Sequence, residues 1–139
     1  MITPYWEHFE HRADIGVRGY GNSPAEAFEQ AALALSAIIT DLTLIDPAEA
    51  VHIACEETDR ELLLADWLNA LIFEMATRKM LFSRFQVVIE DGRLQATAWG
   101  EPIDVARQQP TVEIKGATYT ELVVRQQDDH WLAQCVVDV

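Results

Sequence analysis

Residues 85–100 read Phe-Gln-Val-Val-Ile-Glu-Asp-Gly-Arg-Leu-Gln-Ala-Thr-Ala-Trp-Gly. Apolar side chains occupy every second position on both sides of Asp91-Gly92: Phe85, Val87 and Ile89 before it, and Leu94, Ala96 and Ala98 after it. This period of two is typical of strands with one buried face, and Asp-Gly is a turn that joins two antiparallel strands. The stretch therefore predicts a β-hairpin, and with it an antiparallel sheet.

A second hairpin is expected at the C-terminal end. Residues 119–125 and 131–139 have the composition of strands, and the turn between them is expected within Gln126–His130. In the last strand, period-two alternation places Trp131 and Val137 on one face and Asp138 on the other. Shorter strands are predicted at residues 6–10, 15–20 and 50–56.

Two helices are predicted between these strands. Ser23 can cap a helix, Pro24 suits its first position and Glu26 can complete a capping box, which predicts a helix over residues 24–39. A second helix should begin near Asp59, with an apolar stripe at helical spacing formed by Leu64, Trp67, Leu68, Leu71 and Met75. We therefore expect a single domain over residues 1–139. Its predicted class is an α+β two-layer sandwich, with an antiparallel or mixed sheet and two helices packed on one face.

The net charge of the chain indicates which kinds of molecule it can bind. The formal net charge is −13 at pH 7, and such a surface repels phosphate backbones, so strong direct nucleic-acid binding is not expected. A basic protein is a more natural partner. The N-terminus lacks a secretory signal pattern and no apolar run is long enough to span a bilayer. Cys55 and Cys135 are therefore interpreted as reduced residues of a cytoplasmic protein with no membrane role.

Two aspartates lie near the two ends of the sequence. Asp14 is in the segment His11-Arg-Ala-Asp-Ile-Gly16, and Asp138 is next to the terminal Val139. The valines around Asp138 indicate a buried strand rather than a frayed end. If Asp14 lies beside this strand, two side-chain carboxylates and the terminal carboxylate converge, which is a set of ligands suited to a divalent cation.

Known catalytic motifs are absent. His8-Phe9-Glu10 lacks the Pro-Cys-x-x-Cys half of a zinc deaminase site, so His8 and His11 are first interpreted as hydrogen-bonded structural residues. The glycines of residues 16–21 match neither the Walker pattern nor the dinucleotide fingerprint. Lys115 is a rare cation in an apolar, strand-like segment, either a solvated charge or a functional one.

Several segments together resemble the archease family, the small protein partners of the GTP-dependent RNA ligase. The resemblance rests on six blocks in the family order: residues 11–21, 25–32, 63–71, 100–104, 114–119 and 137–139. It implies an archease-like α+β fold and a non-catalytic protein that promotes guanylylation of the ligase. That activity supports repeated turnover in tRNA splicing and RNA repair.

The resemblance also implies particular functional residues. Asp14, Asp138 and Val139 would hold a divalent cation, with calcium the usual ion and magnesium or manganese as alternatives. Lys115 and His11 lie in matching blocks and are candidate partner-contacting residues. Family members often carry a histidine a few residues after the Gly-Glu-Pro-x-Asp block, where this chain has Gln108 and Gln109. This chain therefore lacks the histidine on which a metal-binding or contact role of that loop would depend.

Two other functions stay open at this point. The same cation could serve a stand-alone phosphoesterase, with His8 or His11 as the general base. Alternatively, the ion could be purely structural, with the function carried by a protein-binding face. The three hypotheses differ in what removal of the cation does to ligase guanylylation, to phosphoester hydrolysis and to stability.

Overall fold

The computed structural model describes residues 1–139. Its elements, in chain order, are β1 (Tyr5–His11), β2 (Asp14–Gly21), α1 (Pro24–Ile39), the short 3₁₀ helix η1 (Leu42–Leu44), β3 (Glu49–Glu56), α2 (Arg60–Arg78), β4 (Met80–Glu90), β5 (Arg93–Pro102), α3 (Val105–Gln108), β6 (Gly116–Ala117), β7 (Val123–Gln127) and β8 (His130–Asp138). None of the helices combines the length and apolar character needed to cross a bilayer.

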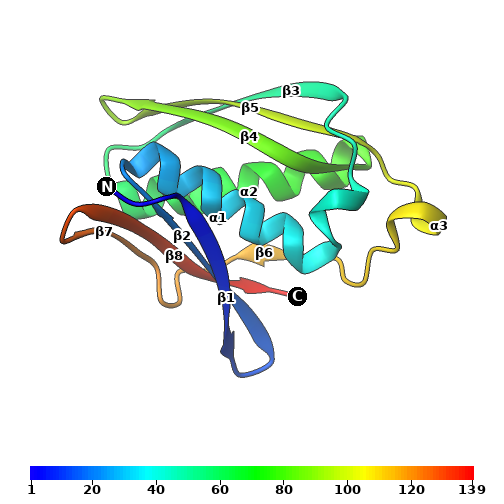
Figure 1. Ribbon diagram of the computed structural model, residues 1–139, viewed down its shortest axis with the longest axis horizontal. Helices are drawn as coiled ribbons and strands as arrows, with labels where there is room; N and C mark the ends of the chain where they lie inside the picture. Colours follow the sequence, from blue (N-terminus) through cyan, green and yellow to red (C-terminus); the bar gives the residue numbers. More distant parts are fainter.

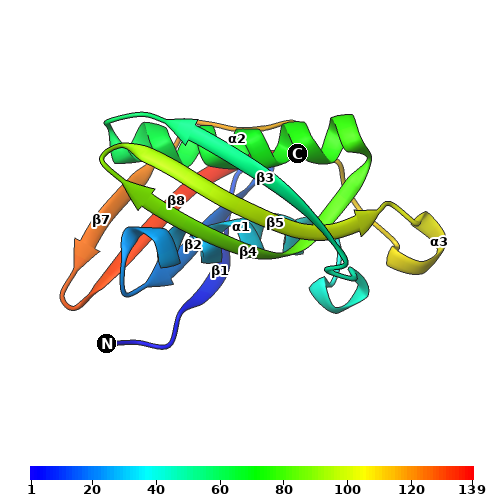
Figure 2. The ribbon, with the colours of Figure 1, turned by 90° about the horizontal axis from the view of Figure 1, so that it is seen from above.

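The strands form two antiparallel sheets with α1 and α2 between them (Figure 1). One sheet has the order β1-β2-β8-β6, with β7 also paired to β8, and the other has the order β3-β5-β4. Helix α1 contacts β2 and β8 of the first sheet and β4 of the second, while α2 contacts β6 and β7 on one side and β3 and β4 on the other. Figure 2 shows the three-stranded sheet crossing over both helices.

The predicted α+β class and the antiparallel pairing are confirmed. The layers differ from the expected arrangement of one sheet covered on one face, because the helices are enclosed by a sheet on each side. Helix α1 shows why: nine of its 16 residues are buried, and they include Ala27, Ala34 and Ser36 as well as Phe28 and Leu35. A helix that is apolar around most of its circumference needs cover on more than one side.

Local signals set the helix ends as predicted. The Ser23 hydroxyl accepts a hydrogen bond from the Glu26 N–H at 3.2 Å, and the Glu26 carboxylate accepts one from the N–H of Asn22, one residue before the expected partner. Asp59 caps α2 by accepting from the N–H groups of Glu61 and Leu62. Helix α2 ends at Arg78, because Lys79 follows in the left-handed region with φ +54°.

Both predicted hairpins are present, with altered limits. Strand β4 begins at Met80 rather than Phe85, and its pairing with β5 shifts register between Phe82 and Arg84. The second turn is shorter than predicted, because β7 continues to Gln127 and β8 begins at His130. Residues 119–122 precede β7 instead of belonging to it.

The core lies in the helical layer and joins both sheets. It contains 29 buried residues, including Trp67, whose indole N–H donates to the Phe28 carbonyl at 3.1 Å. Close approach of α1 to β2 requires Gly19, since a Cβ there would lie 2.1 Å from the Ala27 carbonyl oxygen. Cys55 and Cys135 are both free thiols, and burial raises the pKa of Cys135 to about 12.

Candidate functional site

Asp14 and the C-terminal residues lie at the same end of two paired strands. Strand β2 begins at Asp14, and its register on β8 places Ile15 opposite Val137. The Val139 N–H donates to Oδ1 of Asp14 at 3.5 Å. The structure therefore brings Asp14, Asp138 and Val139 together at one end of the five-stranded sheet, which is the condition that the sequence analysis had left open.

The two aspartates belong to the outer face of that sheet. Val137 is fully buried in the core, so alternation along β8 directs Asp138 away from the helices. Asp14 precedes the partly buried Ile15, which packs against the same core, so the same alternation applies on β2. Asp138 is exposed, whereas Asp14 and Val139 are half-buried, so a partner has access to this end of the sheet.

Lys115 and His11 are adjacent to this site in the backbone pairing. The Lys115 N–H donates to the Asp138 carbonyl at 2.8 Å, and the Lys115 side chain is exposed. His11 is the last residue of β1 and pairs with Asp14 across the β1–β2 hairpin. His8 is different, because its Nε2 is hydrogen-bonded to the Ala34 carbonyl at 2.7 Å, which agrees with its interpretation as a structural residue.

The available donors suit a hard cation. The chain has no group of three or more His, Cys, Asp or Glu side chains arranged to hold a metal ion. Asp14 and Asp138 reach three ligands only with the Val139 carboxylate, and all of these donors are oxygens. Oxygen donors favour calcium, magnesium or manganese over zinc, and calcium tolerates the most irregular geometry.

The loop with Gln108 and Gln109 has a structural role. The Gln108 side chain is fully buried: its Oε1 accepts from the Asp104 N–H at 2.9 Å, and its Nε2 donates to Glu101 at 3.0 Å and to the Pro102 carbonyl at 3.3 Å. Hydrogen bonds to Glu101 from Arg107, Asp46 and Gln108 lower the pKa of that carboxyl to about 2. Both ends of the Gln108 amide are therefore occupied inside the loop.

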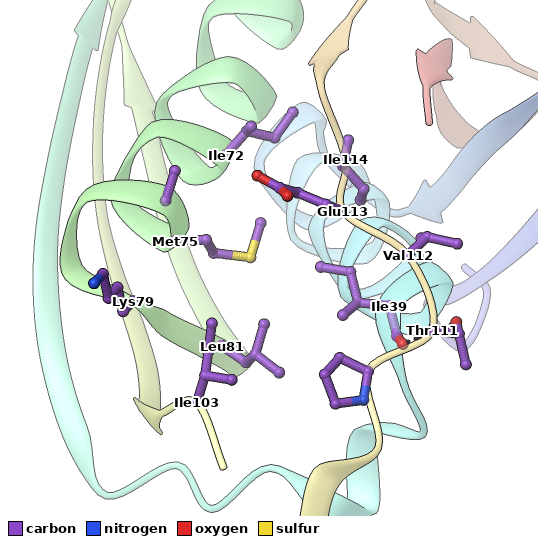
Figure 3. Close-up of a pocket in the computed structure, with 12 residues that line it drawn as sticks. Ile39, Ile72, Met75, Lys79, Leu81, Ile103, Thr111, Val112, Glu113 and Ile114 are labelled. Atoms are coloured by element: carbon purple, nitrogen blue, oxygen red, sulfur yellow. Dashed lines mark hydrogen bonds between the residues drawn. The ribbon is translucent and has the colours of Figure 1, made fainter. Parts of the chain in front are cut away.

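The structure also contains an apolar pocket that the sequence analysis did not predict. It has a volume of about 520 Å³ and lies between the end of α1, the last turns of α2 and the segment 110–114 (Figure 3). Eight of its 12 lining residues are hydrophobic. The signal in the sequence was the alternation of Val112 and Ile114 with polar residues, but the other walls come from distant segments.

Comparison with known proteins identifies the family. Residues 6–139 match the model of the archease protein family (MTH1598/TM1083). Protein archease of Pyrococcus furiosus is 40% identical over 139 residues, covering 96% of this chain and 98% of its own, and that of Methanopyrus kandleri is 38% identical over 138 residues.

Solved structures give the same result. The solution structure of protein 1598 of Methanobacterium thermoautotrophicum has a TM-score of 0.85 at 35% identity, covering 96% of this chain and 98% of its own. An archease of Thermotoga maritima, described as a possible chaperone, shares the fold with a TM-score of 0.66 at 23% identity, covering 94% of each chain. The chain described here belongs to the archease family.

Proposed function

We propose that this protein is a non-catalytic activator of a GTP-dependent RNA ligase, and that it acts through a divalent cation held by Asp14, Asp138 and the Val139 carboxylate. The activity it would promote is guanylylation of the ligase, and with it multiple turnover in tRNA splicing and RNA repair. The observation that carries the proposal is the contact between Asp14 and Val139 at the end of β2 and β8. The choice of an RNA ligase as the partner rests on the resemblance to archeases.

The protein's own residues would orient the donors. The Val139 N–H holds one oxygen of Asp14 toward the C-terminus, and the Lys115 N–H fixes the backbone of Asp138. When bound, a divalent cation supplies positive charge for the triphosphate on which negative charge develops during guanylyl transfer. Lys115, whose side chain is exposed, and His11, which pairs with Asp14, would contact the ligase beside the cation.

The negative charge of the chain is consistent with an activator that binds the ligase but not the RNA. A net charge of −13 favours association with a basic protein surface and opposes binding of RNA to the activator itself. The ligase would therefore keep the RNA while the activator approaches its nucleotide site. Salt should weaken the association, since exposed charges are screened.

The test is a guanylylation assay of the ligase from the same organism with radiolabelled GTP. We expect the wild-type protein to raise the fraction of guanylylated ligase, and Asp14→Asn, Asp138→Asn or deletion of Val139 to abolish the increase while circular dichroism shows an intact fold. Asp128→Asn is a matched control, since it removes the same charge in the β7–β8 turn. Full stimulation by both Asp14→Asn and Asp138→Asn would refute the cation mechanism.

Two further measurements separate the other functions. Hydrolysis of p-nitrophenyl phosphate by the purified protein, lost in Asp138→Asn, would indicate a phosphoesterase instead. A melting temperature that falls with a chelator, together with unchanged ligase stimulation, would indicate a purely structural ion. The proposal predicts neither result.

A further inference from the structure

The apolar pocket at the end of α2 is bordered by an extended segment with free backbone groups. Along residues 111–115, exposed and buried side chains alternate, with Ile114 buried and Glu113 and Lys115 exposed. This alternation is typical of a strand, although the segment belongs to neither sheet. It leads directly into β6, the edge strand of the five-stranded sheet.

The ends of this segment are hydrogen-bonded, but its middle is not. The Thr111 N–H donates to the Ile39 carbonyl and the Lys115 N–H to the Asp138 carbonyl, both at 2.8 Å. Val112, Glu113 and Ile114 make no backbone hydrogen bond within the protein. In an extended chain, alternate residues direct their N–H and C=O groups to the same side, so Val112 and Ile114 direct theirs away from α1 and β8. These groups form a strand edge without backbone partners, half-buried at Val112 and buried at Ile114.

The pocket beside this edge carries one unneutralised carboxylate. Figure 3 shows the Glu113 side chain over the pocket between Ile72 and Ile114, with the Lys79 amine at the far edge. Glu113 takes part in none of the ion pairs of the protein. A ligand that combines an apolar group for the pocket with a positive charge beside Glu113, away from the equally unpaired Lys79 amine, therefore suits this site.

We propose that the pocket and the segment 111–115 bind an extended segment of a basic partner protein by strand addition. The peptide backbone would pair with Val112 and Ile114, a branched apolar side chain would enter the pocket, and a lysine or arginine two residues away would face Glu113. Edge pairing supplies affinity and the alternating side chains supply specificity. The net charge of −13 favours such a basic segment over an acidic one. The proposal makes no use of the cation site.

Two synthetic peptides test this directly by fluorescence anisotropy: fluorescein-labelled Thr-Leu-Thr-Lys-Thr-Leu-Thr and the same peptide with glutamate in place of lysine. We expect the lysine peptide to bind about tenfold more tightly, and Glu113→Lys to reverse the preference. Glu113 is exposed, so the substitution should leave the fold intact. Amide chemical shifts of Val112 and Ile114 should move on titration, which identifies the edge that pairs.

A matched pair of variants separates the pocket from general hydrophobic binding. Ile103 lines the pocket and is 40% exposed, whereas Val88 on β4 is 52% exposed and does not line it. Ile103→Asp should abolish binding of the lysine peptide and Val88→Asp should not. The proposal is overturned if the lysine peptide fails to bind below about 1 mM, if both peptides bind equally, or if the shifts fall on another strand edge.

Discussion

Replacement of Gln108 by alanine should destabilise the protein substantially, although glutamine is usually a surface residue. The side chain is fully buried and makes three hydrogen bonds, one of them to the carboxylate of Glu101. Two neutral bonds contribute about 1 kcal/mol each and the bond to the charged group about 2 kcal/mol. Ordering the glutamine side chain on folding costs about 1.5 kcal/mol of rotamer entropy, and alanine does not have this cost.

The expected net loss is therefore about 2.5 kcal/mol, which for a chain of this size corresponds to a fall in melting temperature of roughly 8 °C. Urea unfolding followed by far-UV circular dichroism measures the free energy directly. Gln109→Ala is the matched control, because Gln109 is the adjacent residue and is exposed. Its φ is +52°, and glutamine and alanine are both non-glycine residues at that position. Its loss should stay within about 0.5 kcal/mol.

Equal losses in Gln108→Ala and Gln109→Ala would refute the structural role assigned to the Gln108 amide. Stimulation of the ligase should be unchanged in Gln108→Ala at temperatures where the variant is folded. A selective loss of stimulation with normal stability would instead mean that this loop takes part in the activity.

Three further predictions test the packing, the electrostatics and the thiols. Gly19→Ala should lower the free energy of unfolding by more than about 2 kcal/mol, because its Cβ would meet the backbone of α1. Gly16→Ala should cost less, because the atoms nearest to its Cβ belong to the movable Phe9 ring. Equal costs of the two variants in urea unfolding would contradict this. Its hydrogen bonds lower the pKa of Glu101 from 4.5 to about 2, so the contribution of this carboxylate to stability is present above pH 4.5 and is lost as the pH falls toward 2. In Glu101→Gln, the measured free energy of unfolding should therefore fall less steeply between pH 4.5 and pH 2. Burial raises the pKa of both thiols, and that of Cys135 to about 12. Ellman's reagent at pH 8 should therefore label Cys55 slowly and Cys135 only after unfolding. Rapid labelling of Cys135 in the native protein would contradict its burial.

Helices and hairpins could be predicted from the sequence because their signals are local. Ser23 and Asp59 cap the two long helices where the sequence indicated, and Asp91-Gly92 joins β4 to β5. The division into two sheets could not be predicted in the same way. Alternation shows which face of a strand is buried, but it does not show that β3 pairs with β5 while β2 pairs with β8.

The candidate site could also be predicted only in part, because some of its features depend on contacts between distant segments. The proximity of Asp14 to Val139 was conditional on an ordered last strand, and the pairing of β2 with β8 supplies that order. The burial of Gln108 had no signal, because the side chain is enclosed by contacts that depend on the folded loop. The apolar pocket was missed because its walls come from α1, α2, β4 and the segment 110–114.

The most direct test of the proposed activity compares Asp138→Asn with Asp128→Asn in the guanylylation assay. Both variants remove one exposed carboxylate from β8 or the turn before it, so they change the net charge equally. The cation mechanism predicts stimulation at the wild-type level with Asp128→Asn and none with Asp138→Asn. Equal stimulation of ligase guanylylation by the two variants would contradict it.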